Sequence, residues 1–282
     1  MKKKIISALL VLAIGVSLVS CSQQNGSSKH NDGEPDRETE VADLKANEDY
    51  FTFRDSKSGL KLTGLTDKGK EQETLVIPSG VIISCTLTEG KVKNVYFESD
   101  DDIDLKLLLS GSDTIETVKL PANLTKLTPI ECCSNLKEIT IPKGVTEIPE
   151  LCFFSDSSLK TVNIEGDVTI IDASAFKQCE SLESINIPDS VTIIGDWAFL
   201  GCKSLKTLTL PKGLKVIGEN AFQNQENGIQ TIIVPEELEL EEWDDDAFDQ
   251  LDSEYTVKVV KGSWADIHFD EVFYGNAKKK YA

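Results

Sequence analysis

The sequence predicts a β-rich repeat solenoid, and three regularities in its 282 residues support this fold class. A segment of about 23 residues repeats from residue 72 onward, most repeats carry an alternating apolar stretch that ends at a proline, and a phenylalanine recurs at one place in successive repeats. Periods of this length are typical of solenoids, whose coils bury their apolar faces only against neighbouring coils. We therefore expect an elongated, non-catalytic molecule of stacked coils.

The repeat has an almost constant length, which sets the number of coils. Successive coil starts are separated by 20, 23, 21, 23, 23, 23, 24 and 26 residues. They lie at Gln72, Val92, Ile115, Leu136, Leu159, Leu182, Leu205, Ile229 and Tyr255. We expect about eight coils in one stack, with a cap at each end.

Each coil opens with a strand of alternating apolar residues that stops at a proline. Residues 182–188 read Leu-Glu-Ser-Ile-Asn-Ile-Pro, and residues 205–211 read Leu-Lys-Thr-Leu-Thr-Leu-Pro. Proline lacks the N–H that a central ladder needs, so it marks the end of the strand. Glu98 and Glu165 replace the proline in two coils. A second apolar stretch follows, as in Val191–Gly195, and then a short turn with Ala198 and Phe199.

One column of aromatic residues recurs with the period of the repeat. Phe153, Phe176, Phe199 and Phe222 are spaced by 23 residues, Phe248 follows after a longer coil, and Leu109 and Ile130 precede them. Stacked coils would place these side chains about one strand spacing, ~4.8 Å, apart. They predict a continuous apolar spine through the stack.

The repeat resembles the BspA-like leucine-rich repeats of bacterial surface proteins. That family's pattern is Leu-x-x-Ile-x-Ile-Pro, then Val-x-x-Ile-Gly, then Ala-Phe-x-x-Cys-x-Ser-Leu, and residues 182–205 match it almost throughout. The resemblance covers about residues 50 to 262 and weakens before residue 115. It implies a solenoid displayed outside the cytoplasm.

The ends of the repeat array are expected to be capped, because an uncapped solenoid exposes an apolar end and an unpaired edge. We assign residues 48–71 to an N-terminal cap, 72–254 to the repeats and 255–282 to a C-terminal cap. Tyr50–Leu65 looks like the strands that open such domains, and Lys261–Trp264 resembles the family's closing segment. The aromatic-rich stretch to Tyr274 would then cover the last coil.

The N-terminus reads as an export signal with a lipid anchor. Residues 1–20 have a basic start and a 15-residue apolar run, too short to span a bilayer comfortably. Leu18-Val19-Ser20-Cys21 resembles the bacterial lipobox, which implies lipid attachment at Cys21; the alternative is an ordinary leader with a chance cysteine. Residues 21–47 are polar and predict a flexible tether.

Charge and residue types exclude several functions. The formal charge of −19 becomes −22 without Lys2, Lys3 and Lys4, and such a surface repels nucleic acid. His30 and His268 have no nucleophile at a suggestive spacing, so we expect neither an enzyme nor a bound cofactor. Acidic runs at residues 100–102 and 236–246 could hold calcium, but they lack known calcium-loop spacings, and solvated surface is the favoured interpretation.

Three cysteines occupy one repeat position. Cys133, Cys179 and Cys202 each lie three residues before the next coil start. The family resemblance implies a buried small residue there, and free cysteine packs well at such a place. A disulfide between Cys179 and Cys202 is the alternative that an exported protein permits.

The outward positions of the first strand are the candidate partner-binding residues. Strand alternation places them on one face about 40 Å long. They are Asn94, Tyr96, Thr117, Lys119, Glu138, Thr140, Thr161, Asn163, Ser184, Asn186, Thr207 and Thr209, continued by Thr231 and Ile233. The alternative is that threonine merely suits exposed strand positions. A second candidate is the convex turn, where Leu151, Phe154, Trp197 and Leu200 would form an apolar patch if exposed; burial against the stack is the favoured interpretation there.

The leading functional hypothesis is a lipid-anchored cell-surface protein that mediates protein–protein binding or adhesion. We expect a monomer in the cell envelope, with an extracellular or envelope protein, such as a host matrix protein, or a glycan as partner. One alternative is an accessory carbohydrate-binding lipoprotein, although the strand face offers only Tyr96 for stacking on a sugar. A structural envelope spacer with no specific partner is the other alternative.

Overall fold

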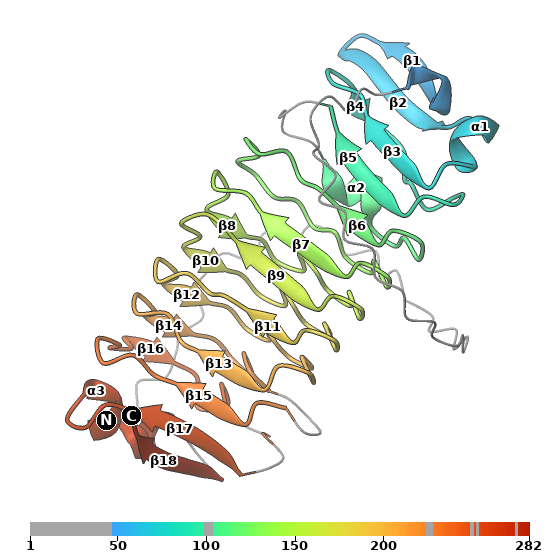
Figure 1. Cartoon of the computed structure of the whole chain (residues 1–282). Helices are drawn as coiled ribbons and strands as arrows, with labels where there is room; N and C mark the ends of the chain where they lie inside the picture. The colour runs from blue at the N-terminus through green and yellow to red at the C-terminus, as the bar shows by residue number, and fades with distance from the viewer. Residues whose placement is uncertain (1–46, 99–103, 224–227, 249–250, 252–253, 274–275) are drawn as a thin grey trace, which may run out of the picture.

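The computed structural model of the protein describes residues 47–98, 104–223, 228–248, 251, 254–273 and 276–282. These residues form an elongated solenoid whose coils stack in sequence order from one end to the other (Figure 1). Cys21, Asp100–Asp102 and Tyr274 lie outside the described residues, as does nearly all of the predicted tether.

The first strands of the coils, extended at the C-terminal end by one strand of the cap, form two parallel sheets along one side of the molecule, which we call the strand face. The first sheet contains β3 (Thr74–Ile77), β5 (Asn94–Phe97), β6 (Thr117–Val118), β7 (Glu138–Ile141), β9 (Thr161–Ile164) and β11 (Ser184–Ile185). The second contains β13 (Thr207–Thr209), β15 (Thr231–Ile233), β17 (Tyr255–Val259) and β18 (Ala277–Tyr281). The solenoid prediction is thus confirmed, but the strand face is divided into two sheets.

The strand register follows the predicted coil starts. Strands β3 to β15 of the strand face each begin two residues after a predicted start. Thr231 pairs with Thr256, which places the last coil start at Glu254, one residue before the predicted Tyr255. The predicted start is off by one residue because the last coil has no proline after its strand to fix the frame, since Pro235 is the last proline of the chain.

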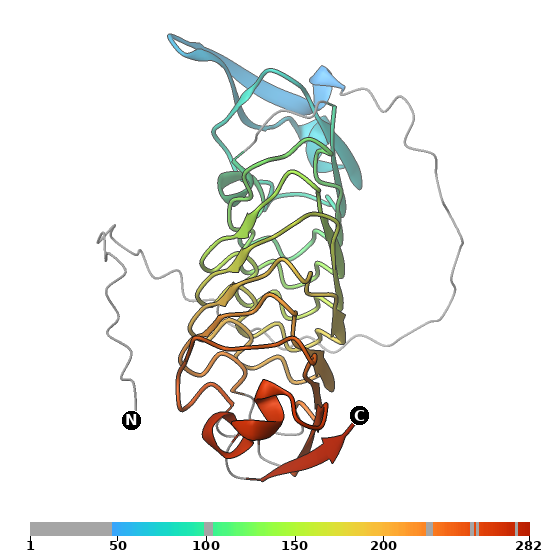
Figure 2. The ribbon, with the colours of Figure 1, turned by 90° about the vertical axis from the view of Figure 1, so that its left-hand side faces the viewer.

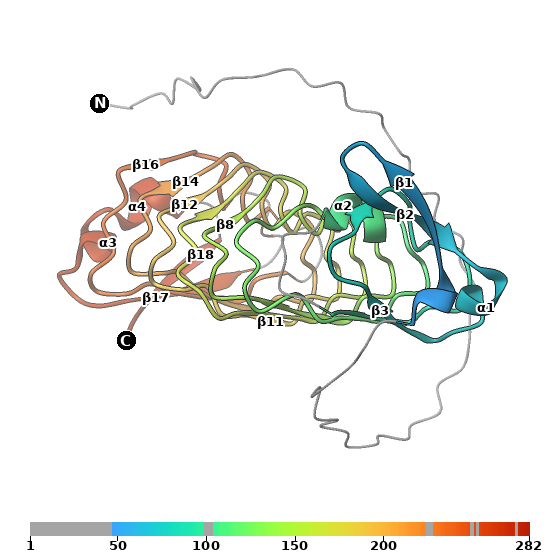
Figure 3. The same cartoon turned by 90° about the horizontal axis from the view of Figure 1, so that it is seen from above.

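A second parallel ladder runs along the opposite side of the coils (Figures 2 and 3). It consists of two-residue strands formed by the second apolar stretch of successive coils. These are β8 (Glu147–Ile148), β10 (Ile170–Ile171), β12 (Ile193–Ile194), β14 (Val216–Ile217) and β16 (Glu242–Trp243). This ladder is continuous over its five strands, so the coils are held together on two sides.

The predicted phenylalanine spine is confirmed. Successive rings of Phe153, Phe176, Phe199, Phe222 and Phe248 are stacked, with centroids 5.3, 5.2, 5.5 and 5.3 Å apart. All five rings are buried. Leu109 and Ile130 are buried as well, although Leu109 lies in a short helix, α2 (Leu105–Leu109), rather than in a turn.

The turns that carry the spine form a hydrogen-bonded ladder of their own. The N–H of Phe153 donates to Ala175 O at 2.7 Å, and the N–H of Phe176 donates to Ala198 O at 2.8 Å. Residues with positive φ recur at two places in these turns, with the period of the repeat. One column is Leu151, Ser174, Trp197 and Asn220, and the other is Cys132, Ser155, Gln178 and Gly201.

The cysteine position is one column of buried side chains that reach the preceding coil. The Cys179 thiol donates to Phe153 O at 3.1 Å, and the Cys202 thiol donates to Phe176 O at 3.2 Å. Both cysteines are unbridged, as are the other four in the described part of the chain. Burial raises the pKa of the Cys202 thiol, which makes it a poor nucleophile. The structure thus shows buried thiols at this position.

Both ends of the stack are covered. At the N-terminal end are η1 (Glu48–Tyr50), the antiparallel pair β1 (Phe51–Ser56) and β2 (Gly59–Leu65), and α1 (Asp67–Lys70); β2 then pairs in parallel with β4 (Ile82–Ile83). At the C-terminal end are α3 (Trp264–Ile267) and α4 (Phe269–Val272), and the Phe273 ring lies 5.0 Å from Phe248. No helix among the described residues is long and apolar enough to cross a membrane.

Candidate functional site

The strand face presents the predicted partner-binding residues outward. In β7 and β9, exposed Glu138, Thr140, Thr161 and Asn163 alternate with buried residues that enter the core. Lys119, Ser184, Asn186, Thr207 and Thr209 are also exposed, whereas Asn94, Tyr96 and Thr117 are half-buried. The exposed members therefore concentrate in the central coils.

Parallel register aligns these side chains in two columns across the coils. Thr140 pairs with Asn163, and Thr161 pairs with Ser184 on the next strand. Neighbouring parallel strands are about 4.8 Å apart, so residues of one column are close neighbours. From Thr140 to Thr209 the outward residues are threonine, serine and asparagine, without a charge. We call these seven residues, Thr140, Thr161, Asn163, Ser184, Asn186, Thr207 and Thr209, the uncharged strip.

Several charged residues beside the strip are paired with one another, whereas exposed Glu138, the neighbour of Thr161 in register, forms no ion pair with a described residue. At the start of the strands, Lys160 pairs with Glu183 at 3.5 Å, and Lys137 pairs with Glu116. Beyond the end of the strands, Lys212 lies 3.7 Å from Asp189. By contrast, no hydrogen bond joins the side chains of Asn163 and Asn186 to any described residue. The strip thus keeps its hydrogen-bonding groups available between two rims that carry these ion pairs.

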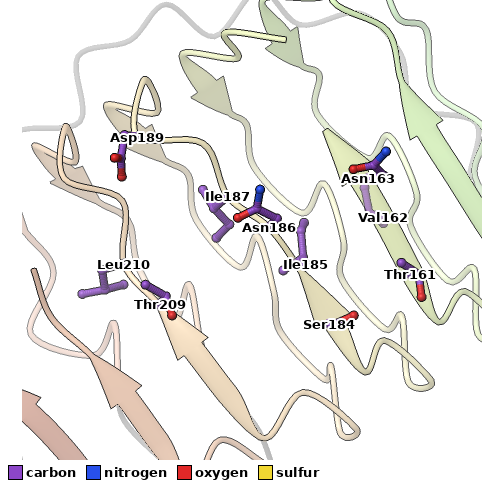
Figure 4. A pocket seen from close by; sticks show the side chains of 10 residues that line it. All are labelled: Thr161, Val162, Asn163, Ser184, Ile185, Asn186, Ile187, Asp189, Thr209 and Leu210. Carbon is purple, nitrogen blue, oxygen red and sulfur yellow. The ribbon is translucent and has the colours of Figure 1, made fainter. Parts of the chain in front are cut away.

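A depression of about 460 Å³ lies within the uncharged strip, where the strand face is divided (Figure 4). Strands β11 and β13 belong to different sheets, so the ladder stops between them. The lining residues come from β9, from β11 and the segment after it, and from β13. They are Thr161, Val162, Asn163, Ser184, Ile185, Asn186, Ile187, Asp189, Thr209 and Leu210.

The division of the sheet changes the burial of one core residue. Ile185 points inward like Val162 and Leu208, its counterparts on the adjacent strands. Those two are 1% exposed, whereas Ile185 is only half-buried and packs against the edge of the core. The sequence of residues 182–188 follows the repeat pattern closely and carries no sign of this division. The repeat pattern therefore predicts the face but not the depression.

The other candidate sites do not come together in the described residues. No group of three or more His, Cys, Asp and Glu side chains there could hold a metal ion, and this includes residues 236–246. His268 stacks on Trp264 at 4.5 Å, and its Nδ1 lies 2.9 Å from Trp264 O, within the C-terminal cap. Its contacts are those of a packing residue.

The convex turns do not form a fully exposed apolar patch. Leu151, Phe154, Trp197 and Leu200 are all half-buried. The Lys177 ammonium lies 5.4 Å from the Trp197 ring centre, which covers part of that ring. The strand face is thus the stronger candidate surface.

One buried acid interrupts the cysteine column. Asp156 holds the place of Cys133 and Cys179 in its own coil, and its Oδ1 accepts a hydrogen bond from Cys133 N–H at 2.7 Å. Its Oδ2 is the one buried side-chain oxygen or nitrogen in the described structure that lacks a partner. Burial raises the pKa of this carboxyl well above its ordinary value. The Cys152 and Cys179 thiols near it are buried as well, and burial raises their pKa, which makes them poor nucleophiles.

Comparisons with known proteins agree with the architecture. The chain matches the sequence profile described as BspA type Leucine rich repeat region, in six copies over residues 77–183 and 169–267. No curated protein matches the sequence.

Solved structures of bacterial leucine-rich repeat proteins are also similar. One from Bacteroides ovatus is 19% identical, with 79% of this chain and 66% of that chain covered and a TM-score of 0.38. The T. pallidum leucine-rich repeat protein is 19% identical, with 70% and 74% covered and a TM-score of 0.28. Pneumococcal vaccine antigen PcpA is 17% identical, with 74% and 66% covered and a TM-score of 0.37. This chain spans just under two thirds of the first and third structures.

Proposed function

This chain belongs to the BspA-type leucine-rich repeat family, and we propose that it is a cell-surface protein that binds another macromolecule, in adhesion or in envelope assembly, through its strand face. The observation that carries the proposal is the uncharged strip. On a chain with a formal charge of −19, a run of outward residues without charge is a distinct surface.

The energetics of association favour the strip over the surrounding surface. Unpaired amide and hydroxyl groups can exchange water for a partner without first breaking internal hydrogen bonds. The ion pairs on the rims would have to be broken or desolvated before they could contact a partner, and interface centres are generally depleted in charged residues. The rims thus suit the border of an interface and the strip suits its centre.

The position of the protein in the cell is part of the proposal. Residues 1–20 serve as an export leader, Cys21 carries the lipid, and residues 21–47 act as a tether. Two or more acyl chains anchor a protein stably, whereas a single chain binds a membrane only marginally. A flexible segment of 27 residues has a root-mean-square reach of roughly 30 Å. The solenoid would then stand clear of the membrane surface with its strand face accessible.

The binding proposal can be tested with charged substitutions on the strip. The full chain is immobilised and probed with a panel of host matrix proteins and envelope proteins. For any partner found, Asn163→Arg and Asn186→Arg should weaken binding about tenfold or more, because the new charges cannot be desolvated against an uncharged partner. Thr146→Arg, an exposed change beside the second ladder, is the control and should have little effect. Equal binding by all three variants would exclude the strip as the site.

The anchor is tested independently of the partner. Cells that express the chain are fed a fatty acid with an alkyne tag, and labelling of the protein is measured. Labelling should disappear with Cys21→Ala and persist with Cys85→Ala. Labelling that survives Cys21→Ala would remove the anchor from the proposal.

A further inference from the structure

The depression between β11 and β13 has an apolar floor inside a polar surface, and this points to a defined partner chemistry. We infer that it receives an aliphatic side chain from an extended, uncharged polypeptide segment lying on the strand face. The inference rests on the proposed function, since it assigns a partner class to the same surface.

The floor is made by a core residue that the divided sheet leaves uncovered. Ile185 has neighbours on both sides, Val162 and Leu208, that are 1% exposed, yet it remains half-buried. Below it the stack is intact, because β12 pairs with β14 and the Phe199 and Phe222 rings lie 5.5 Å apart. The depression is therefore confined to the strand face, and its floor is the packed apolar core.

Hydrogen-bonding side chains surround that base. The exposed amides of Asn163 and Asn186 stand on adjacent coils, with the Thr209 hydroxyl across the division (Figure 4). Each amide offers both a donor and an acceptor, as does each unit of a polypeptide backbone. A partner that places an aliphatic side chain in the depression would bring its backbone within hydrogen-bonding reach of Asn163, Asn186 and Thr209.

The composition of the lining favours a polypeptide over a sugar or a charged ligand. None of the ten lining residues is aromatic, so the platform on which sugars commonly stack is missing. The single carboxylate, Asp189, accepts a hydrogen bond from Lys212 N–H at 3.2 Å and pairs with the Lys212 ammonium. Because Asp189 is already paired with Lys212, it is a weak ligand for a cation. The remaining groups provide aliphatic contact for a side chain and hydrogen bonds for an uncharged backbone.

A plugging experiment tests the inference. The full chain is applied to an array of immobilised 12-residue peptides that vary one central position among Leu, Ile, Val, Ala, Lys and Glu within uncharged flanks, and to a glycan array. We expect binding to peptides with a central Leu, Ile or Val, and a loss of about tenfold or more with Ala, the amount that corresponds to burying an aliphatic side chain. Asn186→Trp and Thr209→Trp, which place an indole over the opening, should abolish this binding. Thr140→Trp, which adds an indole to the same strip outside the depression, should change the affinity for these peptides less than about threefold.

The outcomes separate this inference from the proposed function. Peptide binding that depends on the central side chain and disappears only in the two plugged variants supports it. Binding to glycans alone, binding that ignores the central side chain, or equal loss in all three tryptophan variants would overturn it. If Asn186→Trp and Thr209→Trp leave a natural partner bound while Thr140→Arg, a charge on the same strip outside the depression, releases it, the strand face binds but the depression does not take part.

Discussion

The central coils and the N-terminal coils fill the interior of the stack with different residues. In residues 136–223 each turn carries a stacked phenylalanine and the period is 23 residues, whereas in residues 72–135 Leu109 and Ile130 take that place and α2 replaces one turn. Yet the first sheet runs unbroken from β3 to β11, and it stops only between β11 and β13, among the most regular coils. Regular turns therefore do not guarantee a continuous strand face.

The strands and the turns therefore hold the stack independently. Where the strand ladder stops, the β12–β14 pairing and the Phe199–Phe222 contact continue. Where the phenylalanines stop, the strand ladder continues through Thr117 and Glu138. Each coil contacts only its neighbours, so a local weakness on one side is compensated within the same pair of coils.

The largest expected effect comes from removing a spine residue beside the divided strand face. Phe199→Ala should lower the free energy of unfolding by about 3–5 kcal/mol, because a buried ring stacked on both sides leaves a cavity. Leu109→Ala in the N-terminal coils should cost less, about 2–4 kcal/mol, since fewer buried atoms are removed. Urea denaturation followed by circular dichroism measures both. A larger loss for Leu109→Ala would mean that the N-terminal coils, not the spine, limit stability.

The second prediction concerns Asp156, the acid in the cysteine column. Asp156→Cys should raise the free energy of unfolding at pH 7, because it removes a buried oxygen that has no partner and restores the residue type of Cys133 and Cys179. The gain should be smaller than the ~1–3 kcal/mol cost of that oxygen, since Cys133 N–H loses its acceptor, Asp156 Oδ1. The folded-state pKa is raised above the ordinary 3.8, so the folded state binds more protons than the unfolded state above that pH. Stability should therefore fall as pH rises from about 3.8 toward the raised value.

The pH dependence supplies the control for Asp156. Asp156→Asn keeps an oxygen for Cys133 N–H and removes the ionisable proton, so this component of the pH dependence should vanish in both variants. Denaturation curves at pH 5, 7 and 9 would measure it. If the slope stays the same in both variants, Asp156 is not its source.

Sequence pattern was sufficient for features that repeat and insufficient for those that occur once. The spine, the coil starts and the outward strand residues follow from period and alternation, since every coil repeats the same packing. The half-burial of Ile185 depends on how two sheets meet, and residues 182–188 are among the most regular of all. Strand β18 could not be inferred either, because Lys278–Lys280 has the composition of a solvated segment and pairs only through β17.

A third, smaller effect should be equal in the two regions. Gly201 in the central turns and Gly80 near the N-terminal end both have positive φ, +79° and +67°. A Cβ added at Gly201 would meet nothing closer than 3.6 Å, and at Gly80 nothing within 4 Å. Each Gly→Ala change should thus cost only the backbone preference, about 1–2 kcal/mol, in urea denaturation. A clearly larger cost at Gly201 would show that the convex turn tolerates less adjustment than the N-terminal loop.

The smallest expected effect concerns the ion pairs that link neighbouring coils in both regions. Lys203 pairs with Glu180 in the central coils and Lys106 pairs with Glu131 in the N-terminal coils, each at 2.9 Å. Lys203→Gln should lower the free energy of unfolding by about 0.5 kcal/mol or less, because exposed pairs gain little over hydration. Lys106→Gln should cost slightly more, since the Glu131 side chain is 22% exposed against 44% for Glu180. In 1 M NaCl, where the Debye length is about 3 Å, both differences should shrink. A cost well above 1 kcal/mol that persists in salt would mean that these pairs, and not the spine and the two ladders, hold the coils in register.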